Sequence, residues 1–429
     1  MRRNHLWIAG VGILASLLFL PPFSSAAAPA IKEKVIYSFQ GGADGAYPLS
    51  DLILDSAGNL YGTTSSGGSG CCGIVFELKR AQGGWKEEVL HEFTGGNDGS
   101  TPQAGLIFDP AGNLYGTTAF GGTSGLGTVF KLTPDSKGGW AESVIYSFNY
   151  SGSAGYSPST DLVYDTQGNL FGTTPQGAIE TCSKFNGCGA VFELTPLRDG
   201  TWKETTIHQF SGSPDGAMPS SGLILDSAGN FYGMTEYGGA GRCASNEYQG
   251  CGAIYKLTSD SHGGWTETVL YTFALGGGFG IFPSGELILD EAGCLFADSQ
   301  AGGDQYGTVF QLQESRKFGW QQGVLHRFFG PPLDGQYPTG RLVRRSVNGD
   351  LFGVARAGGA NRYGLVFELE HSKGDKEQVL HSFAGPPDGA YPAAGLLRDS
   401  RGHLYGTTRY GGSAIACTGG CGTVYEVVP

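Results

Sequence analysis

Residues 105–118 read GLIFDPAGNLYGTT, and six further stretches of the chain repeat this pattern. The other copies cover residues 52–64, 161–174, 222–235, 286–299, 341–355 and 395–408. The glycine of the central turn, Gly112 in this copy, recurs every 53 to 64 residues. Repetition at such a period indicates that each copy is one supersecondary unit of a repeat architecture.

Each repeat contains four short runs rich in β-branched and aromatic residues, separated by turn residues. In the second repeat the runs are LIFD, LYGTT, TVFKL and VIYSF, and Asp, Gly and Asn form the turn between the first two. No run shows a helical period over ten or more residues. Four antiparallel strands repeated seven times predict an all-β fold, a seven-bladed β-propeller with four strands per blade.

The two ends of the repeat region indicate how the ring closes. The segment VIYSF at residues 35–39 matches the fourth run of a repeat, and the segment GTVYEVVP at residues 422–429 matches the third run. We therefore expect the N-terminal strand to complete the last blade, which removes exposed sheet edges. An open solenoid is the alternative, but it would need polar capping repeats, and these ends resemble the middle of the chain.

Residues 1–30 have the pattern of a secretory signal peptide. Arg2 and Arg3 precede an apolar run from Leu6 to Leu20, and the small-residue stretch SSAAAPA follows. The small residues allow cleavage after Ala30 or a few residues earlier, and an uncleaved anchor is the competing interpretation. We expect residues 31–429 to form a single propeller domain that is secreted, periplasmic or located at the cell surface.

The charge of the chain restricts its partners. The net charge is −12, and removal of Arg2 and Arg3 with the leader changes it to −14. Nucleic-acid phosphates favour Lys and Arg patches, so we expect no nucleic-acid partner. No later segment is long and apolar enough to span a bilayer, and we expect a monomer without a membrane span after signal cleavage.

The loops that join one repeat to the next are candidate ligand-binding segments, because they approach the propeller axis. Five of the seven contain an aspartate: Asp44, Asp98, Asp215, Asp334 and Asp388. A ring of carboxylates at the channel mouth could hold Ca²⁺ through oxygen ligands, although no cofactor is required. Tyr47, Tyr337 and Tyr391 could offer apolar faces to sugar rings. Asp-Gly followed by Pro is also an ordinary turn, and this interpretation stays open.

Repeats five and six depart from the common pattern. The segment ALGGGFGIFP replaces the usual loop at residues 274–283, and Arg341 opens the first run of the sixth repeat. Such divergence is typical of an enzyme whose axial site uses one or two special blades. Drift in tolerant repeats explains it equally well. We therefore take Arg341 as a candidate ligand-binding residue and assign no catalytic residue.

Four histidines occupy one position of the fourth run: His91, His208, His326 and His381. Tyrosine takes this position in the other three repeats, which indicates amphipathic packing. One imidazole per blade on the outermost strand does not supply the ligands that a zinc site needs. We expect these histidines to have a structural role.

Nine cysteines in an exported chain suggest disulfides. The expected pairs are Cys71–Cys72, Cys182–Cys188, Cys243–Cys251 and Cys417–Cys421. Cys294 is left without a partner. Metal binding is the alternative, but CxxC spacing is absent and the pairs belong to different repeats.

The repeats resemble the GloVer tandem repeats of exported bacterial proteins, whose pattern is similar to GNLYGTTSSGGSG followed by GIVFEL in this chain. The resemblance covers nearly all of residues 35–429. It implies export and a repeat architecture, and no established activity.

These observations predict an exported, non-enzymatic binding or interaction module. Its ligand is expected to be a carbohydrate, a cation or an envelope partner at the loop-rich face, because the repeats look alike and catalysis usually needs one that differs. The alternative is a propeller-type polysaccharide lyase or hydrolase with an axial site. Fold alone does not identify the ligand.

Overall fold

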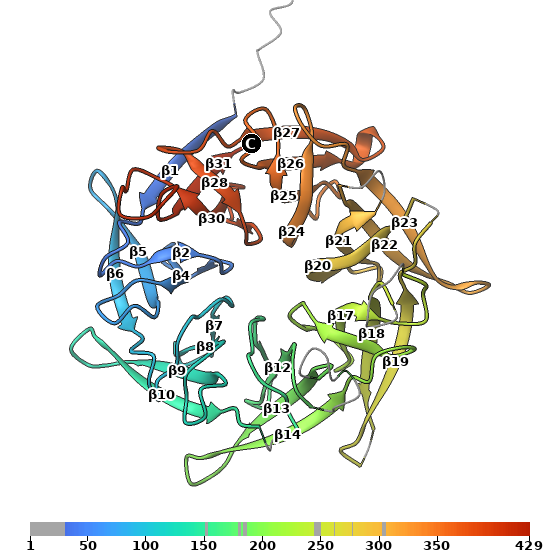
Figure 1. Cartoon of the computed structure of the whole chain (residues 1–429), viewed down its shortest axis with the longest axis horizontal. Coiled ribbons are helices and arrows are strands. Elements are labelled where there is room, and N and C mark those ends of the chain that lie inside the picture. The colour runs from blue at the N-terminus through green and yellow to red at the C-terminus, as the bar shows by residue number, and fades with distance from the viewer. Residues whose placement is uncertain are drawn as a thin grey trace, which may run out of the picture. The chain divides into compact units, whose positions relative to one another are not determined.

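The computed structural model describes residues 31–429 except 151–152, 179–181, 183–186, 244–249, 261, 277 and 303–305. Residues Ile31–Pro429 form one compact unit of seven antiparallel sheets arranged in a ring (Figure 1). The described residues contain one 3₁₀ helix, η2 (His371–Lys373), between strands of the sixth blade. None of them forms a helix long and apolar enough to span a membrane. The predicted all-β, seven-bladed propeller is confirmed.

The first four blades follow one another along the chain. Blade 1 contains β2 (Ala46–Pro48), β3 (Ile53–Leu54), β4 (Leu60–Ser66), β5 (Ile74–Ala81) and β6 (Gly84–Glu92). Blade 2 contains β7 (Ile107–Phe108), β8 (Leu114–Thr118), β9 (Thr128–Pro134) and β10 (Trp140–Ser147). Blade 3 contains β11 (Val163–Tyr164), β12 (Leu170–Thr174), β13 (Ala190–Pro196) and β14 (Trp202–Gln209). Blade 4 contains β15 (Gly216–Pro219), β16 (Ile224–Leu225), β17 (Phe231–Gly238), β18 (Ala253–Ser259) and β19 (Trp265–Thr272).

The remaining three blades complete the ring. Blade 5 contains β20 (Gly280–Leu289), β21 (Leu295–Gly302), β22 (Thr308–Ser315) and β23 (Gly319–Arg327). Blade 6 contains β24 (Gly335–Arg344), β25 (Leu351–Gly358), β26 (Leu365–Glu370) and β27 (Lys376–Ser382). Blade 7 contains β28 (Gly389–Pro392), β29 (Leu397–Arg398), β30 (Leu404–Gly411), β31 (Thr423–Val428) and, from the other end of the unit, β1 (Lys32–Ser38).

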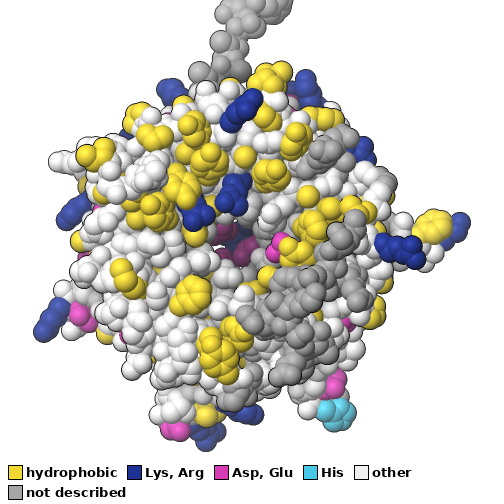
Figure 2. Space-filling model, in the orientation of Figure 1, with side chains coloured by type: hydrophobic (Ala, Val, Ile, Leu, Met, Phe, Trp, Pro, Cys, Tyr) yellow, Lys and Arg dark blue, Asp and Glu magenta, His cyan; other side chains and the backbone are white. Residues whose placement is uncertain are grey.

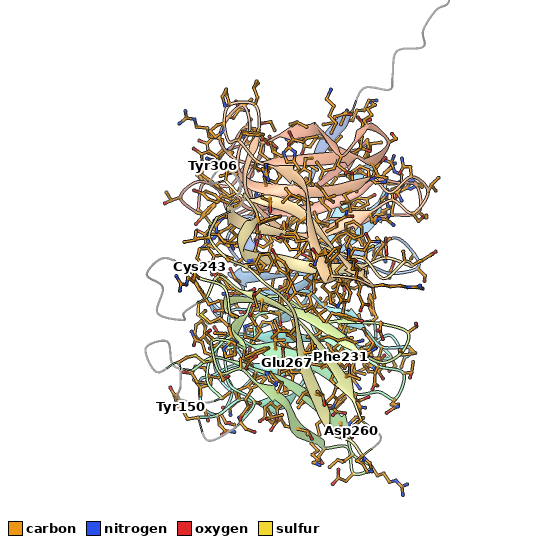
Figure 3. The ribbon with its side chains drawn as sticks, turned by 90° about the vertical axis from the view of Figure 1, so that its right-hand side faces the viewer. Tyr150, Phe231, Cys243, Asp260, Glu267 and Tyr306 are labelled. Atoms are coloured by element: carbon orange, nitrogen blue, oxygen red, sulfur yellow. A yellow bond between two sulfur atoms is a disulfide. The ribbon has the colours of Figure 1, made fainter. Side chains whose placement is uncertain are left out.

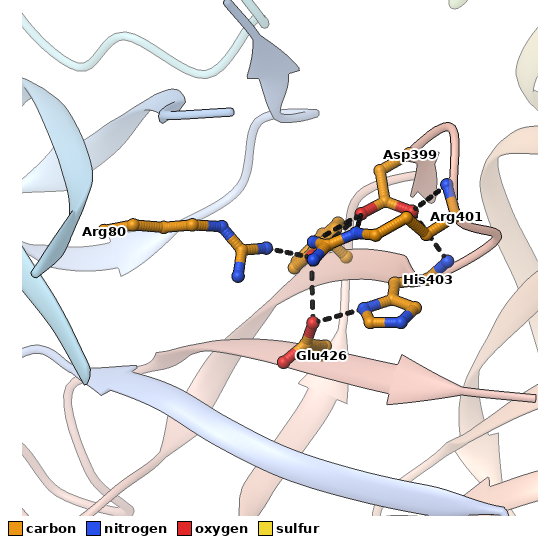
Figure 4. Close-up of polar contacts among 6 residues, drawn as sticks. Arg80, Asp399, Arg401, His403 and Glu426 are labelled. Atoms are coloured by element: carbon orange, nitrogen blue, oxygen red, sulfur yellow. Dashed lines mark hydrogen bonds and ion pairs between the residues drawn. The ribbon is translucent and has the colours of Figure 1, made fainter. Parts of the chain in front are cut away.

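The N-terminal strand closes the ring as predicted. β1 pairs antiparallel with β31, from Lys32 opposite Val428 to Ser38 opposite Thr423. A polar network also joins blade 1 to blade 7 (Figure 4): the guanidinium of Arg80 donates a 2.7 Å hydrogen bond to the hydroxyl of Tyr405. Lys32–Ser38 and Thr423–Val428 are therefore held in one sheet, which is hydrogen-bonded to blade 1.

The inner strand of each blade begins earlier than the sequence indicates. The AYP-type segments, which we expected in loops, pair with the second strand of their own blade, as Ala46 does with Ser66. The Gly and Pro in these segments are typical of turns, but here they belong to an irregular strand. The residue before each proline has a positive φ of 54–58°: Tyr47, Thr101, Ser157, Met218, Phe282, Tyr337 and Tyr391.

This irregular backbone locks each blade to the one before it. The N–H of Thr101, for example, donates a 2.8 Å hydrogen bond to the carbonyl of Cys72 in the preceding blade, and all seven blades repeat the contact. The next residue, Pro102, lies against Gly73, where an added Cβ would be 2.6 Å from the proline Cδ. The proline of the first strand of one blade and the glycine before the third strand of the preceding blade are therefore the two sides of one inter-blade contact.

The cores between blades are aromatic. Each outermost strand is followed by a fully buried phenylalanine that meets an aromatic ring of the next blade edge-on, at centroid distances of 5.0–5.4 Å. These phenylalanines are Phe39, Phe93, Phe148, Phe210, Phe273, Phe328 and Phe383. Such geometry adds about 1 kcal/mol per pair to the burial term.

The two faces of the ring are built from different connections. In the side view, Tyr150 and Tyr306 lie on the same side, and Asp260 lies on the other (Figure 3). The first face carries the loops between blades and the loops between second and third strands. We call it the loop-rich face.

Candidate functional site

One column of the repeat faces the axis of the ring. It is the third residue after the proline of each inter-blade contact and directly precedes a leucine. Its seven members are Asp51, Gly105, Asp161, Gly222, Glu286, Arg341 and Gly395. Four blades thus point a charged side chain inward, and three blades carry glycine.

The glycines make room for the charged side chains. The N–H of Gly105 donates a 2.5 Å hydrogen bond to the carboxylate of Asp161 on the next blade, and the N–H of Gly395 does the same for Asp51. A Cβ on Gly222 would lie 2.6 Å from a carboxyl oxygen of Glu286. Three of the seven positions therefore carry glycine because the axis is too narrow for seven side chains.

Arg341 lies between acidic groups at the centre. Its guanidinium is 3.4 Å from Asp51 and 3.6 Å from Glu286. Carboxyl oxygens of Asp51, Asp161 and Glu286 lie within 4.8 Å of one another. Figure 2 shows acidic side chains at the bottom of the central hollow and basic side chains nearer its rim.

The hollow changes the protonation of its carboxyl groups. Burial, together with the nearby Asp51 carboxylate, raises the pKa of Asp161 to about 6, although Arg341 acts in the opposite direction. Burial and Asp161 also raise the pKa of Glu286 well above its ordinary value, again against the effect of Arg341. Burial therefore favours the neutral forms of Asp161 and Glu286, and a neutral carboxyl group can donate a hydrogen bond as well as accept one.

The hollow is small and polar. It has a volume of about 150 Å³, and small or hydroxyl-bearing residues such as Ser159, Thr160 and Thr339 line it beside the four charged groups. A group the size of part of one sugar ring or a hydrated cation fits such a volume, and a whole oligosaccharide would extend beyond it.

A tyrosine belt lies on the loop-rich face over blades 6, 7 and 1. The rings of Tyr363 and Tyr391 are 5.7 Å apart, those of Tyr391 and Tyr410 are 5.9 Å apart, and those of Tyr410 and Tyr47 are 5.4 Å apart. The guanidinium of Arg409 lies 5.2 Å from the ring of Tyr410. Figure 2 shows apolar side chains gathered over these blades beside the hollow.

The other predicted site residues have different surroundings. Tyr47 and Tyr391 belong to the belt, and Tyr337 is 43% exposed on the inner strand of blade 6. Arg341 reaches the axis. The five loop aspartates do not join it, and none of Asp44, Asp98, Asp215, Asp334 and Asp388 lines the hollow.

Each loop aspartate instead lies against the outermost strand that precedes it. Asp44 accepts hydrogen bonds from the hydroxyl of Tyr37 and the N–H of Gln40, at 3.0 and 2.8 Å. The other four approach a histidine at the position of Tyr37. The histidines thus occupy the blade edge, as expected, but each has a carboxylate partner that the sequence analysis did not assign.

The cysteines come together in the four expected pairs. Disulfides join Cys71 to Cys72, Cys182 to Cys188, Cys243 to Cys251 and Cys417 to Cys421. Cys294 is buried and unpaired in the described part of the chain.

Three axial residues were missed by the sequence analysis: Asp51, Asp161 and Glu286. A signal for them is present in the sequence, because this column contains only glycine and charged residues. Aligning the seven repeats on the locking proline reveals it.

Two solved structures with a similar fold are described as extracellular domains. One is the extracellular domain of a protein described as a hybrid two component system from B. thetaiotaomicron, with 13% identity and a TM-score of 0.55 over 93% of this chain and 42% of that chain. A second, described as a one component system from the same organism, has 13% identity and a TM-score of 0.52 over 93% and 41%. The chain thus spans about two fifths of these solved chains, and the likeness shows the fold alone.

Curated proteins gave no match to this sequence. The model of the Gloeobacter/Verrucomicrobia repeat matches residues 25–185 and 179–425. Those ranges contain all seven copies of the repeat and the strands of every blade, apart from the last three residues of β31. The chain therefore belongs to the Gloeobacter/Verrucomicrobia repeat family.

Proposed function

We propose that the chain is an exported, non-enzymatic binding propeller, and that it binds a carbohydrate at the axial hollow and the adjoining tyrosine belt. The observation that supports this most is the convergence of Asp51, Asp161, Glu286 and Arg341 on the axis. The other three blades carry glycine at this position, which leaves room for the four charged side chains. Export is supported by the leader-like residues 1–30 and by the disulfide pairs.

The chemistry of the site suits a polyhydroxylated ligand. Carboxylates accept hydrogen bonds from hydroxyl groups, and the guanidinium of Arg341 donates them. The belt from Tyr363 to Tyr47 adds apolar ring surface within the same face. Part of one sugar ring would enter the hollow while neighbouring units lie along the tyrosines.

An enzymatic role is the second candidate. The pKa of Asp161, raised to about 6 by burial, is near the range in which a carboxyl group acts as a general acid or base. In that case a polysaccharide would be cleaved at the axis, and Asp161→Asn would abolish turnover while leaving measurable binding.

The test is titration of the purified protein with a panel of neutral, acidic and amino-sugar oligosaccharides, with product analysis of each mixture. Ca²⁺ is titrated in a separate experiment, because the carboxyl oxygens of Asp51, Asp161 and Glu286 lie close together. We expect Arg341→Ala and Asp161→Asn to weaken binding at least tenfold. Glu291→Gln, an exposed acid in an inter-strand turn on the opposite face, is the matched control. Binding that survives both axial substitutions would contradict the site.

A further inference from the structure

A second set of polar residues recurs at the outer edge of the ring, independently of the axial hollow. It combines the histidine of one outermost strand, the aspartate of the loop that follows, and a glutamate from the outermost strand of the next blade. Three interfaces contain the complete set with ligand atoms within 4.8 Å of one another: His208, Asp215 and Glu267; His326, Asp334 and Glu377; His381, Asp388 and Glu33.

The imidazole and the aspartate already face each other. Nε2 of His208 lies 3.3 Å from Asp215, and Nε2 of His381 lies 3.1 Å from Asp388. At the His381 interface the glutamate of the next strand is also near, with Oε2 of Glu33 at 3.9 Å from the same nitrogen. One nitrogen and two carboxyl groups thus converge from two blades.

Surrounding groups hold two of the three side chains in place. The ring of each histidine packs edge-on against the phenylalanine two residues later, at 4.6–4.8 Å. Backbone N–H groups donate to each aspartate, such as that of Ser211 to Asp215 at 2.9 Å and that of Ala384 to Asp388 at 2.8 Å. In metal sites, supporting contacts of this kind orient the side chains that bind the ion.

The third member has an unsatisfied atom. One carboxyl oxygen in each of Glu33, Glu267 and Glu377 is buried and has no hydrogen-bond partner among the described residues. A buried acceptor without a partner destabilises the fold, because it has lost its hydrogen bonds to water. Glu267, labelled in Figure 3, comes from β19, whereas His208 ends β14, so the unsatisfied group lies at the contact between two blades.

We propose that these three sets are inter-blade sites for a divalent transition metal ion of the Zn²⁺ class. Each would supply one imidazole nitrogen and two carboxylate oxygens, and water would complete a tetrahedral shell. The nitrogen ligand favours Zn²⁺ over Ca²⁺, which takes oxygen ligands. Side chains that remain 12–22% exposed leave a route for the ion and the water. The ion would tie adjacent outermost strands together.

An inter-blade interface that lacks the complete set serves as a control within the same molecule. Tyr146 occupies the histidine position between blades 2 and 3, and it faces Glu204, with no aspartate in the following loop among the described residues. Tyrosine is thus tolerated at this position, so His208→Tyr, His326→Tyr and His381→Tyr should fold. Glu204→Gln changes the equivalent glutamate at an interface that lacks the set.

The experiment is calorimetric titration of the chelator-treated protein with ZnCl₂, with metal analysis after dialysis. We expect each His→Tyr substitution to remove one Zn²⁺ equivalent and the triple variant to lose three, while Glu204→Gln loses none. If the triple variant fails to fold, Glu267→Gln tests one site alone. An unmodified protein that binds no Zn²⁺, or a folded triple variant that retains the full stoichiometry, would overturn the proposal.

Discussion

The backbone N–H of Tyr47 donates a 2.8 Å hydrogen bond to the carbonyl of Cys421, across the junction where blade 1 meets blade 7. Each of the two residues is followed by a member of a second inter-blade contact, in which Pro48 packs on Gly422. The same bond and the same Pro–Gly contact occur at the six other junctions. The junction between blade 7 and blade 1 is therefore built like the six junctions between blades that follow one another along the chain.

Gly422→Ala should destabilise the protein strongly. The added Cβ would lie 2.5 Å from Cδ of Pro48, and the residue has a φ of 98°. Gly138→Ala is the matched control, because Gly138 has a φ of 84° and nothing within 4 Å of an added Cβ. We expect about 1 kcal/mol of lost stability for the control and about 3 kcal/mol for Gly422→Ala, measured by denaturant unfolding. Equal losses would mean that the Pro–Gly contact is not important.

Arg341→Ala should destabilise the protein more at pH 8 than at pH 5. Without the guanidinium, Asp51, Asp161 and Glu286 repel one another when ionised. Burial and Asp51 already raise the pKa of Asp161 to about 6, and removal of Arg341 raises it further. A raised pKa gives stability below the unfolded value that is lost as pH rises through the folded value. We expect a loss of about 2 kcal/mol at pH 8, with exposed Arg398→Ala as the control. A pH-independent loss would contradict the argument.

Glu87→Gln should make the protein less sensitive to alkaline pH. Glu87 lies on the outermost strand of blade 1, and burial, with the charges of Asp44 and Glu88, raises its pKa to about 7. The stability that the neutral form supplies is complete below about pH 4.5 and lost as pH rises through 7. Because the side chain is only partly buried, we expect a gain on the order of 1 kcal/mol at pH 8 and none at pH 4. Thermal unfolding at the two pH values measures this, and a gain at pH 4 alone would refute it.

Removal of the Cys417–Cys421 disulfide should have a modest effect. The bridge closes a loop with a sequence separation of four residues. A loop of this size gives about 2 kcal/mol in the chain-entropy treatment. We expect the free energy of unfolding of the double Cys→Ser variant to fall by about that amount in both oxidising and reducing buffer. The unmodified protein should lose stability only when it is reduced. Insensitivity of the unmodified protein to reductant would contradict a structural role.

Much of the fold could be predicted from the sequence, because the repeats carry local turn chemistry and complementary ends. The segment VIYSF predicted the closing strand that pairs with β31. The AYP strand was missed because Gly and Pro are typical of turns, and the inter-blade bond of Tyr47 is not a local property.

Prediction of the site was less complete, for a physical reason. Arg341 was identified as a candidate because it departs from the repeat pattern. Asp51 and Asp161 are polar residues before a leucine, and nothing in their local sequence distinguishes them. Their importance depends on convergence at the axis, which only the ring geometry creates. The outer sets were overlooked because their glutamate, such as Glu267, comes from the next blade.

The pairing of β1 with β31 has a consequence for the order of assembly. The two strands are separated by almost the whole described chain, so their pairing closes the longest loop in the molecule. Blades 1 to 6 contain all of their own strands and can form while the chain is still emerging. The first strand, in contrast, has no partner until the last one has been made. Ring closure is therefore the last step of assembly, because Lys32–Ser38 can pair only after Thr423–Val428 has been made.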